Sequence, residues 1–309
     1  MNIANNITET IGNTPLVRLN RIEKHFNLKA NLYAKVEFFN PGSSVKDRIA
    51  LAMIEDAEKK RLIKPGYQIV EATSGNTGIG LAMVGAAKGY NVTLVMPDTL
   101  SVERRKIMKA YGANLVLTEG AKGMRGAIDV ANEIMTKTKE CFMPSQFQNL
   151  ANPEMHYRTT GPEIWNALDG KIDIFLAGVG TGGTISGTGK FLKEKNNDIK
   201  IIAVEPKDSP VLSKGTPGSH KIQGIGAGFI PNTLDVNIYD QILTISNEDA
   251  FEYATLLPKI EGIFVGISSG AALKAAIDIA LFKTNEGKNI VFVLPDTGER
   301  YLSLSLFSE

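Results

Sequence analysis

The sequence predicts an α/β protein in which mostly parallel strands are joined by helices. Short runs of β-branched and other apolar residues alternate with longer amphipathic stretches over most of the 309 residues. Several of these runs are apolar almost throughout, which is typical of strands that helices cover on both faces of a parallel sheet. The alternation indicates strands that are connected by right-handed helical crossovers.

The predicted strands are the short apolar runs, namely Leu32–Glu37, Gln68–Ala72, Asn91–Met96, Asn114–Thr118, Asp173–Gly178, Lys200–Glu205 and Asn289–Leu294. The predicted helices are the longer amphipathic stretches, namely Asp47–Lys60, Thr77–Lys88, Val102–Tyr111, Gly123–Thr136, Thr184–Lys195, Asn247–Lys259 and Ser269–Phe282. The polar segment Ser145–Pro153 is the predicted boundary between an N-terminal and a C-terminal half. The stretch Pro206–Pro231 is rich in Gly, Pro and Ser and has no predicted element; loops of such length are more often functional than accidental.

The composition excludes several classes of protein. With 34 basic and 33 acidic side chains the net charge is +1, and no run of Lys and Arg suggests a nucleic-acid or membrane surface. No apolar stretch approaches the roughly 18 residues of a membrane span. The single cysteine, Cys141, excludes an internal disulfide, and no cysteine or histidine pair has metal-ligand spacing. The first residues lack the pattern of a signal peptide, so we expect a cytoplasmic enzyme without a metal.

The first segment of chemical interest is Asn40–Arg48 (NPGSSVKDR), which turns at Pro41 and Gly42 and opens a helix near Ser44. Lys46 then lies in the first helical turn, where the helix dipole disfavours a cation. Such a lysine is either an ordinary surface residue or an amine whose lowered pKa allows it to form an imine. The segment alone leaves both interpretations open.

The second segment, Thr73–Gly78 (TSGNTG), follows the strand that ends at Ala72 and precedes a helix. Its hydroxyl groups, together with the N–H groups at the helix start, are suited to bind a carboxylate or a phosphate. The alternative is an ordinary turn in which Ser74 or Asn76 caps the helix. The density of small and hydrogen-bonding residues favours a binding loop.

The third segment, Gly178–Thr184 (GVGTGGT), also joins a strand to a helix. Glycine lets the backbone approach a phosphate closely, and the helix start supplies aligned N–H donors. Gly178, Gly180 and Gly183 also fit the G-x-G-x-x-G pattern of dinucleotide-binding proteins, with Glu205 as a candidate ribose-binding acid. An NAD-dependent oxidoreductase is therefore an alternative that this loop leaves open.

The fourth segment, Gly266–Ala272 (GISSGAA), opens a helix of small residues. Ser268 and Ser269 are either cap and first-turn residues or part of a binding site. The segment lacks the G-x-S-x-G pattern of a hydrolase, and no histidine is placed to activate either serine.

In this combination and order, the four segments resemble the cysteine synthase (O-acetylserine sulfhydrylase) family of fold-type II pyridoxal-phosphate enzymes, which includes cysteine-consuming, hydrogen-sulfide-producing members. Further segments extend the resemblance over nearly the whole chain: Ile11–Val17, Thr159–Trp165, Gly224–Pro231 and Pro295–Tyr301. The resemblance implies two open, mostly parallel twisted sheets with flanking helices, as in the β subunit of tryptophan synthase, with pyridoxal 5'-phosphate in the cleft between two domains. Residues 1–12 and 40–150 would form a smaller, substrate-binding domain, and residues 13–39 and 151–309 a larger, cofactor-binding domain. A homodimer is also implied.

The resemblance further implies a role for each matching residue. Lys46 would form the imine with the cofactor and then act as acid and base. Asn76 would bind the ring hydroxyl oxygen, and Ser268 would face the pyridine nitrogen, where a hydroxyl allows a neutral nitrogen and a mild electron sink. The phosphate would be bound by Gly180, Thr181, Gly182, Gly183 and Thr184. The substrate would be bound by Thr73, Ser74, Thr77 and Gln146, which hold its α-carboxylate, and by a bordering loop with Gly226 and Asn232.

The implied reaction is β-replacement through an aminoacrylate intermediate, in which O-acetyl-L-serine loses acetate and sulfide adds to give L-cysteine. Lys46 would remove the α-proton and return it, in ping-pong order. In an alternative from the same family, L-cysteine is the donor, hydrogen sulfide is released, and serine, lanthionine or cystathionine is formed. Asn232 bears on this choice, because an acid there could activate water or a thiol whereas an amide only orients it. Asn232 could equally be an exposed turn residue.

The expected partners are therefore small molecules: an amino acid and sulfide or a thiol. The C-terminus of serine acetyltransferase is a candidate protein partner, and a catalytically silent scaffold for that enzyme is a non-enzymatic alternative. No nucleic-acid or membrane partner is expected.

Overall fold

The structure, a computed structural model, describes residues 3–99 and 102–304, which divide into two compact units. One unit is Asn40–Ala151 together with the chain up to Ile11, and the other is Gly12–Phe39 together with the chain from Asn152 onward. The chain ends named in the predicted domains, at residues 1 and 309, lie outside the described residues. Each unit contains one open sheet with helices on its faces, which confirms the predicted α/β fold class.

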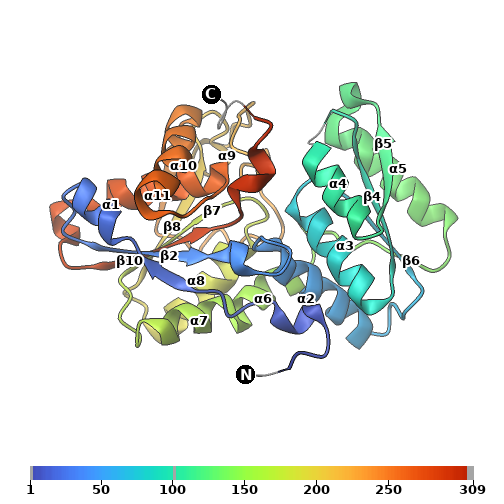
Figure 1. Ribbon diagram of the computed structural model, residues 1–309, viewed down its shortest axis with the longest axis horizontal. Coiled ribbons are helices and arrows are strands. Elements are labelled where there is room, and N and C mark those ends of the chain that lie inside the picture. Colours follow the sequence, from blue (N-terminus) through green and yellow to red (C-terminus); the bar gives the residue numbers. More distant parts are fainter. Residues whose placement is uncertain (1–2, 100–101, 305–309) are drawn as a thin grey trace. The chain divides into compact units, whose positions relative to one another are not determined.

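The sheet of the first unit has the order β5-β4-β3-β6, and its strands are parallel. Its strands are β3 (Gln68–Ala72), β4 (Asn91–Pro97), β5 (Asn114–Thr118) and β6 (Cys141–Phe142). The helices α2 (Lys46–Lys59), α3 (Asn76–Lys88) and α4 (Val102–Ala110) cover one face, and α5 (Gly123–Lys137) covers the other (Figure 1). Alternate strand residues therefore enter two cores: Ile69 and Leu94 face α2 and α3, whereas Val70 and Val95 face α5.

The sheet of the second unit has the order β1-β2-β10-β7-β8-β9. Its strands are β1 (Leu16–Arg18), β2 (Asn31–Val36), β7 (Ile174–Gly178), β8 (Lys200–Pro206), β9 (Gln241–Ile245) and β10 (Asn289–Leu294). All pairings are parallel except that of β1 with β2. Two strands from the two ends of the chain, β2 and β10, thus lie side by side.

Helices cover both faces of this sheet as well (Figure 1). On one face lie α1 (Asn20–His25), α10 (Asn247–Glu261) and α11 (Ile267–Ala280), and on the other α7 (Thr160–Ala167) and α8 (Gly183–Lys195). Leu176 and Phe292 belong to the core under α11, whereas their neighbours Phe175 and Val291 belong to the core under α8. The remaining helices are α6 (Ala151–Arg158), the short α9 (Val211–Lys214), and single 3-10 turns at Ile7–Thr10, Glu37–Phe39, Gly120–Lys122, Lys283–Asn285 and Gly298–Tyr301.

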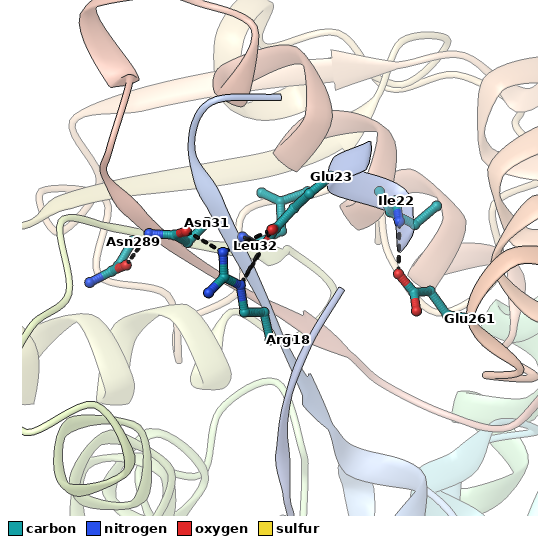
Figure 2. Close-up of polar contacts among 7 residues, drawn as sticks. All are labelled: Arg18, Ile22, Glu23, Asn31, Leu32, Glu261 and Asn289. Atoms are coloured by element: carbon teal, nitrogen blue, oxygen red, sulfur yellow. Dashed lines mark hydrogen bonds and ion pairs between the residues drawn. The ribbon is translucent and has the colours of Figure 1, made fainter. Parts of the chain in front are cut away.

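A polar network holds the N-terminal strands and α1 in the second unit (Figure 2). The Glu23 carboxylate accepts hydrogen bonds from the Arg18 guanidinium at 3.0 Å and from the Leu32 backbone N–H at 2.8 Å. Arg18 also donates to Asn31, whose amide donates in turn to Asn289 on β10 at 2.9 Å. Residues near both ends of the chain are thereby tied together at one end of the sheet.

All the predicted strands and helices are confirmed, with ends that differ by no more than two residues. Sequence analysis missed β1, β6, β9, α1, α6, α7 and α9. The prediction that Pro206–Pro231 contains no element is wrong at α9. Pro153 and Pro162 obscured α6 and α7 because proline usually interrupts helices; each occupies the first turn, where a proline lacks no needed N–H. Within the described residues, no helix is both long and apolar enough to cross a membrane.

Candidate active site

Lys46 is the first residue of α2 in the first unit and is half-buried. Its backbone N–H donates to the Ser44 hydroxyl at 3.2 Å, so that serine stabilises the helix start. The Asp47 carboxylate is buried and accepts the Gly42 N–H at 2.6 Å, while Ser43 between them adopts a left-handed φ of 58°. The turn before Lys46 is therefore fixed by contacts on both sides of the lysine.

The start of α3 lies beside the start of α2. A Cβ atom at Gly80 would lie 3.1 Å from the Lys46 carbonyl oxygen and 3.0 Å from the Ala50 Cβ. Glycine therefore permits a close approach of the two helices at this point. Since Gly80 is one helical turn from Asn76, the loop before α3 is brought close to Lys46.

The loop Thr73–Thr77 connects β3 to α3 and gathers polar groups at the helix start. Thr73 and Thr77 are buried, Ser74 and Asn76 are half-buried, and the Gly75 N–H donates to the Thr73 hydroxyl at 3.3 Å. The first N–H groups of α3 have no carbonyl partner within the helix. Together with the hydroxyl groups, they form a cluster of donors suited to an anion.

Gln146 joins this cluster from the other end of the unit's sequence. The Thr77 hydroxyl donates to Gln146 Oε1 at 2.6 Å, and both side chains are buried. This hydrogen bond orients the glutamine amide. The first unit thus brings together Lys46, the Thr73–Thr77 loop and Gln146, all of which sequence analysis predicted as site residues.

Glu71, which was not predicted from the sequence, binds the backbone of Ser145, the residue before Gln146. Its carboxylate accepts the Ser145 N–H at 2.7 Å and is only 5% exposed. Burial raises the pKa of Glu71 to about 7, against the opposing effect of backbone hydrogen bonds from Ser145 and Gln146. A charged residue within the apolar strand 68–72 is the sequence signal that could have identified it, because carboxylates are rarely buried without a specific partner.

In the second unit, the glycine loop Gly178–Thr184 connects β7 to α8. A Cβ at Gly180 would lie 2.3 Å from the Gly224 carbonyl oxygen, and a Cβ at Gly183 would lie 1.8 Å from Asn152 Oδ1. Gly182 has a φ of 82°, which favours glycine. Close packing at Gly180 and Gly183 and the positive φ of Gly182 favour glycine at these positions. Backbone groups rather than side chains therefore line this part of the loop at the start of α8.

Three residues that sequence analysis missed hold the threonines of this loop. Asn152 donates to the Thr181 hydroxyl at 3.0 Å, and the Thr233 hydroxyl donates to the Thr181 carbonyl oxygen at 2.6 Å. The buried His156 lies between Thr160 and Thr184, with its Nε2 atom 3.2 Å from Thr184 Oγ1. Asn152 and His156 belong to α6, a helix that was not predicted, so no pattern connected them to the glycine loop.

Ser268 lies in the first turn of α11 and is buried. Its Oγ atom lies 3.7 Å from the position that a Cβ at Gly224 would take. Gly224 in turn contacts Gly180, and the Gly226 N–H donates to the Val179 carbonyl oxygen at 2.9 Å. The second unit therefore brings together the glycine loop, Ser268 and the loop with Gly226.

Two other candidates, Asn232 and Glu205, and the single cysteine differ in their surroundings. Asn232 is an exposed turn residue between the buried Pro231 and Thr233. The Glu205 carboxylate is buried and accepts the backbone N–H groups of Leu212 and Ser213 at the start of α9, which makes it unsuited to bind a ribose. Burial raises the pKa of the Cys141 thiol, which disfavours a nucleophilic role.

The geometry therefore fits pyridoxal phosphate better than a dinucleotide. A loop that lacks Cβ atoms and ends at a helix start suits a phosphate, whereas the acid required beside a ribose is already engaged. The model of one family, described as pyridoxal-phosphate-dependent enzyme, matches residues 7–296 of the chain. The fold and site define an enzyme of this class, with pyridoxal phosphate as cofactor.

Comparison with individual proteins identifies a narrower family. A cysteine synthase from Staphylococcus aureus (strain N315) is 57% identical over 98% of this chain and 97% of its own length. The crystal structure of a cysteine synthase from Entamoeba histolytica is 48% identical with a TM-score of 0.96, and the match covers 99% of this chain and 91% of that one. A hydrogen sulfide-producing enzyme from Fusobacterium nucleatum is 49% identical with a TM-score of 0.93, and the match covers 97% of this chain and 100% of that one. The chain therefore belongs to the cysteine synthase family, which confirms the resemblance seen in the sequence.

Proposed function

We propose that the protein is a cysteine synthase, which converts O-acetyl-L-serine and sulfide to L-cysteine and acetate. The observation that supports this proposal most directly is the cluster in the first unit, where the backbone of a lysine at a helix start lies close to the helix that follows a loop of anion-binding donors. A substrate with an α-carboxylate and an α-proton requires these two features. The cysteine synthases among its relatives support the same reaction.

The proposed roles in the second unit concern the cofactor. Gly180, Thr181, Gly182, Gly183 and Thr184 would bind its phosphate through backbone N–H groups and the two hydroxyls that Asn152 and His156 orient. Ser268 would supply a hydroxyl to the ring nitrogen. When bound, pyridoxal phosphate acts as an electron sink for negative charge at the substrate α-carbon.

The proposed roles in the first unit concern the substrate and the proton. Asn76 would bind the ring hydroxyl of the cofactor, and Thr73, Ser74, Thr77 and Gln146 would bind the α-carboxylate. Lys46 would hold the cofactor at rest, take the α-proton when the substrate displaces it, and return that proton at the end. The dipole of α2 disfavours the charged form of an amine at the helix start, and the neutral form is the one that accepts a proton.

The surroundings of Asn232 favour sulfide over water or a thiol as the nucleophile. Water and thiols require a base to become nucleophiles at neutral pH, and the exposed amide of Asn232 cannot accept their proton. Hydrogen sulfide is already ionised to hydrosulfide to a large extent at neutral pH and requires no such base. The cysteine-consuming reaction is thus the second candidate, and the similarity to a hydrogen sulfide-producing enzyme supports it.

One pair of measurements tests the proposed function. The wild-type protein is expected to be yellow with bound pyridoxal phosphate and to form L-cysteine from O-acetyl-L-serine and sulfide. Lys46→Ala is expected to lose both the reaction and the visible band that borohydride abolishes in the wild type, because the covalent attachment is gone. Faster release of sulfide from L-cysteine than formation of L-cysteine would instead establish the second candidate. A wild-type protein that remains colourless with saturating pyridoxal phosphate contradicts both.

Three further proposals concern the assembly, the location and a protein partner. We propose that the protein is a homodimer, that it acts in the cytoplasm, and that the C-terminal carboxylate of serine acetyltransferase competes for the Thr73–Thr77 loop. Size-exclusion chromatography with light scattering tests the first and cell fractionation the second. For the third, a peptide of that C-terminus is expected to compete with O-acetyl-L-serine, whereas the same peptide with an amidated end is not.

A further inference from the structure

Glu71 occupies a position that is costly for a carboxylate. It lies in β3 directly after the fully buried Val70 and is 5% exposed. A buried carboxylate is stable only where it accepts hydrogen bonds. The groups that Glu71 binds must therefore offset the cost of burying it.

The groups that Glu71 binds are backbone N–H groups of the segment after β6. Ser145 donates at 2.7 Å, and the adjacent Gln146 N–H also hydrogen-bonds the carboxylate. Ser145 has a φ of 56°, a left-handed conformation that is uncommon for a residue with a side chain. Such a conformation persists where surrounding contacts enforce it, and Glu71 supplies one of these contacts.

The left-handed turn at Ser145 determines where the next side chain goes. Gln146 is 6% exposed, and its Oε1 atom accepts the Thr77 hydroxyl at 2.6 Å. Glu71 belongs to the same strand that leads into the loop with Thr73 and Thr77. The carboxylate thus couples the chain segment before α3 to the segment that contains Gln146.

We propose that Glu71 is a positioning residue for the amino-acid substrate: by holding the Ser145 N–H it fixes the left-handed turn that places Gln146 beside Thr77. The inference rests on the proposed function, in which Gln146 binds the substrate α-carboxylate. Glu71 itself touches neither the substrate nor the cofactor in this proposal.

The test compares two substitutions of Glu71 in the pyridoxal-phosphate-bound enzyme. Glu71→Leu removes the acceptor, and the KM for O-acetyl-L-serine is expected to rise about tenfold, the effect of one lost hydrogen bond, with a much smaller change in kcat. The dissociation constant of L-alanine, which has the α-carboxylate but no leaving group, is expected to rise in parallel. Glu71→Gln retains an acceptor oxygen and is expected to restore most of the affinity.

Glu23→Leu is the matched control. Glu23 is also a buried carboxylate that accepts a backbone N–H, at 2.8 Å from Leu32, but it lies in the network of Figure 2 in the other unit. Both leucine variants are expected to lower the melting temperature, and only the one at residue 71 is expected to raise the KM. Equal KM values for the two variants, or a fall in kcat at constant KM, overturn the proposal.

Ser145 provides a second test that leaves the carboxylate in place. Valine is β-branched and strongly disfavours a left-handed φ, whereas glycine adopts it readily. Ser145→Val is therefore expected to raise the KM for O-acetyl-L-serine more than Ser145→Gly does. The reverse order overturns the proposal even if Glu71→Leu fails to fold.

The outcome is distinguishable from failure of the proposed function. If the wild type does not form L-cysteine, the proposed function is wrong, whatever the variants do. If the wild type forms L-cysteine and the KM is unchanged in Glu71→Leu and in Ser145→Val, only the positioning role is wrong.

Discussion

Two buried glutamates illustrate how single residues organise loops in this protein. Glu71 accepts N–H groups from Ser145 and Gln146, and Glu205 accepts those of Leu212 and Ser213. Each carboxylate comes from a strand, but the donors to Glu71 begin 74 residues later in the chain, whereas those to Glu205 lie only seven and eight residues later. Both carboxylates are engaged by backbone N–H groups, and only the segment held by Glu71 contains a proposed site residue, Gln146.

The raised pKa of Glu71 predicts how stability depends on pH. Its pKa is about 7 in the folded protein against 4.5 for the free group, so the folded state binds more protons between these values. The free energy of unfolding should therefore fall as pH rises from 4.5 to 7, by about 3 kcal/mol in total, and stay lower above pH 7. Glu71→Gln lacks this titration.

Urea denaturation at pH 5 and pH 8 measures this dependence. The variant Glu71→Gln is expected to gain stability relative to the wild type as pH rises, because the wild type alone must bury a charge at pH 8. A difference between the two proteins that is the same at both pH values would show that Glu71 titrates at its ordinary pKa.

At this scale, the sequence predicted the residues of contiguous motifs and missed those that act through tertiary contacts. Lys46 and the Thr73–Thr77 and Gly180–Thr184 loops are recognisable because each motif joins a turn to a helix start. Asn152 and His156 act on the glycine loop from a helix about 30 residues earlier, which no local pattern reveals. Their role depends on hydrogen bonds that exist only after folding.

The glycine-rich elements show what can be predicted at the scale of a loop and its helix. The absence of side chains at Gly180 and Gly183 predicts a close approach, but not what approaches. In the structure the neighbour of Gly180 is the carbonyl oxygen of Gly224, and the neighbour of Gly183 is Asn152. A segment rich in glycine therefore serves packing between loops as well as access to a phosphate.

Gly180→Ala is expected to weaken cofactor binding. The new Cβ would lie 2.3 Å from the backbone oxygen of Gly224, so both loops must shift. A displacement of that size is expected to reduce the affinity for pyridoxal phosphate at least about tenfold, as measured by fluorescence titration.

Gly66→Ala is the control for this prediction. Gly66 has a φ of 95° but no atom within 4 Å of its added Cβ, so alanine there costs about 1 kcal/mol of stability without a steric clash. Its cofactor affinity should match that of the wild type. If both alanine variants bind the cofactor as tightly as the wild type does, the close approach at Gly180 does not matter for the site.

On the scale of the whole chain, the two units are not two successive segments. Residues 12–39 form β1, α1 and β2 of the second unit, although the first unit follows them in the sequence. Strand β10 lies between β2 and β7, so the middle of that sheet is supplied by residues 289–294. Hydropathy patterns predict seven of the ten strands of the described residues, but strand order depends on pairings between residues far apart, which periodicity does not encode.

Truncation tests the importance of β10. A chain that ends at Lys288 lacks the strand that joins β2 to β7 and loses the Asn31–Asn289 hydrogen bond. Residues 12–39 are then expected to become sensitive to limited proteolysis, whereas in the full chain they are expected to be protected. Protection of this segment in the truncated chain would show that α1 and its contacts suffice to hold it.

The place of β10 has a consequence for how the protein is made. The ribosome releases β2 long before β10, the strand that pairs with its second edge, because Asn289 follows Asn31 by 258 residues. At roughly 5–20 residues per second, β1 and β2 would wait for on the order of ten seconds or more with an unpaired edge. The six-stranded sheet is thus completed only after residues 289–294 have been synthesised, and a nascent chain that stalls before Asn289 presents an open strand edge to its neighbours.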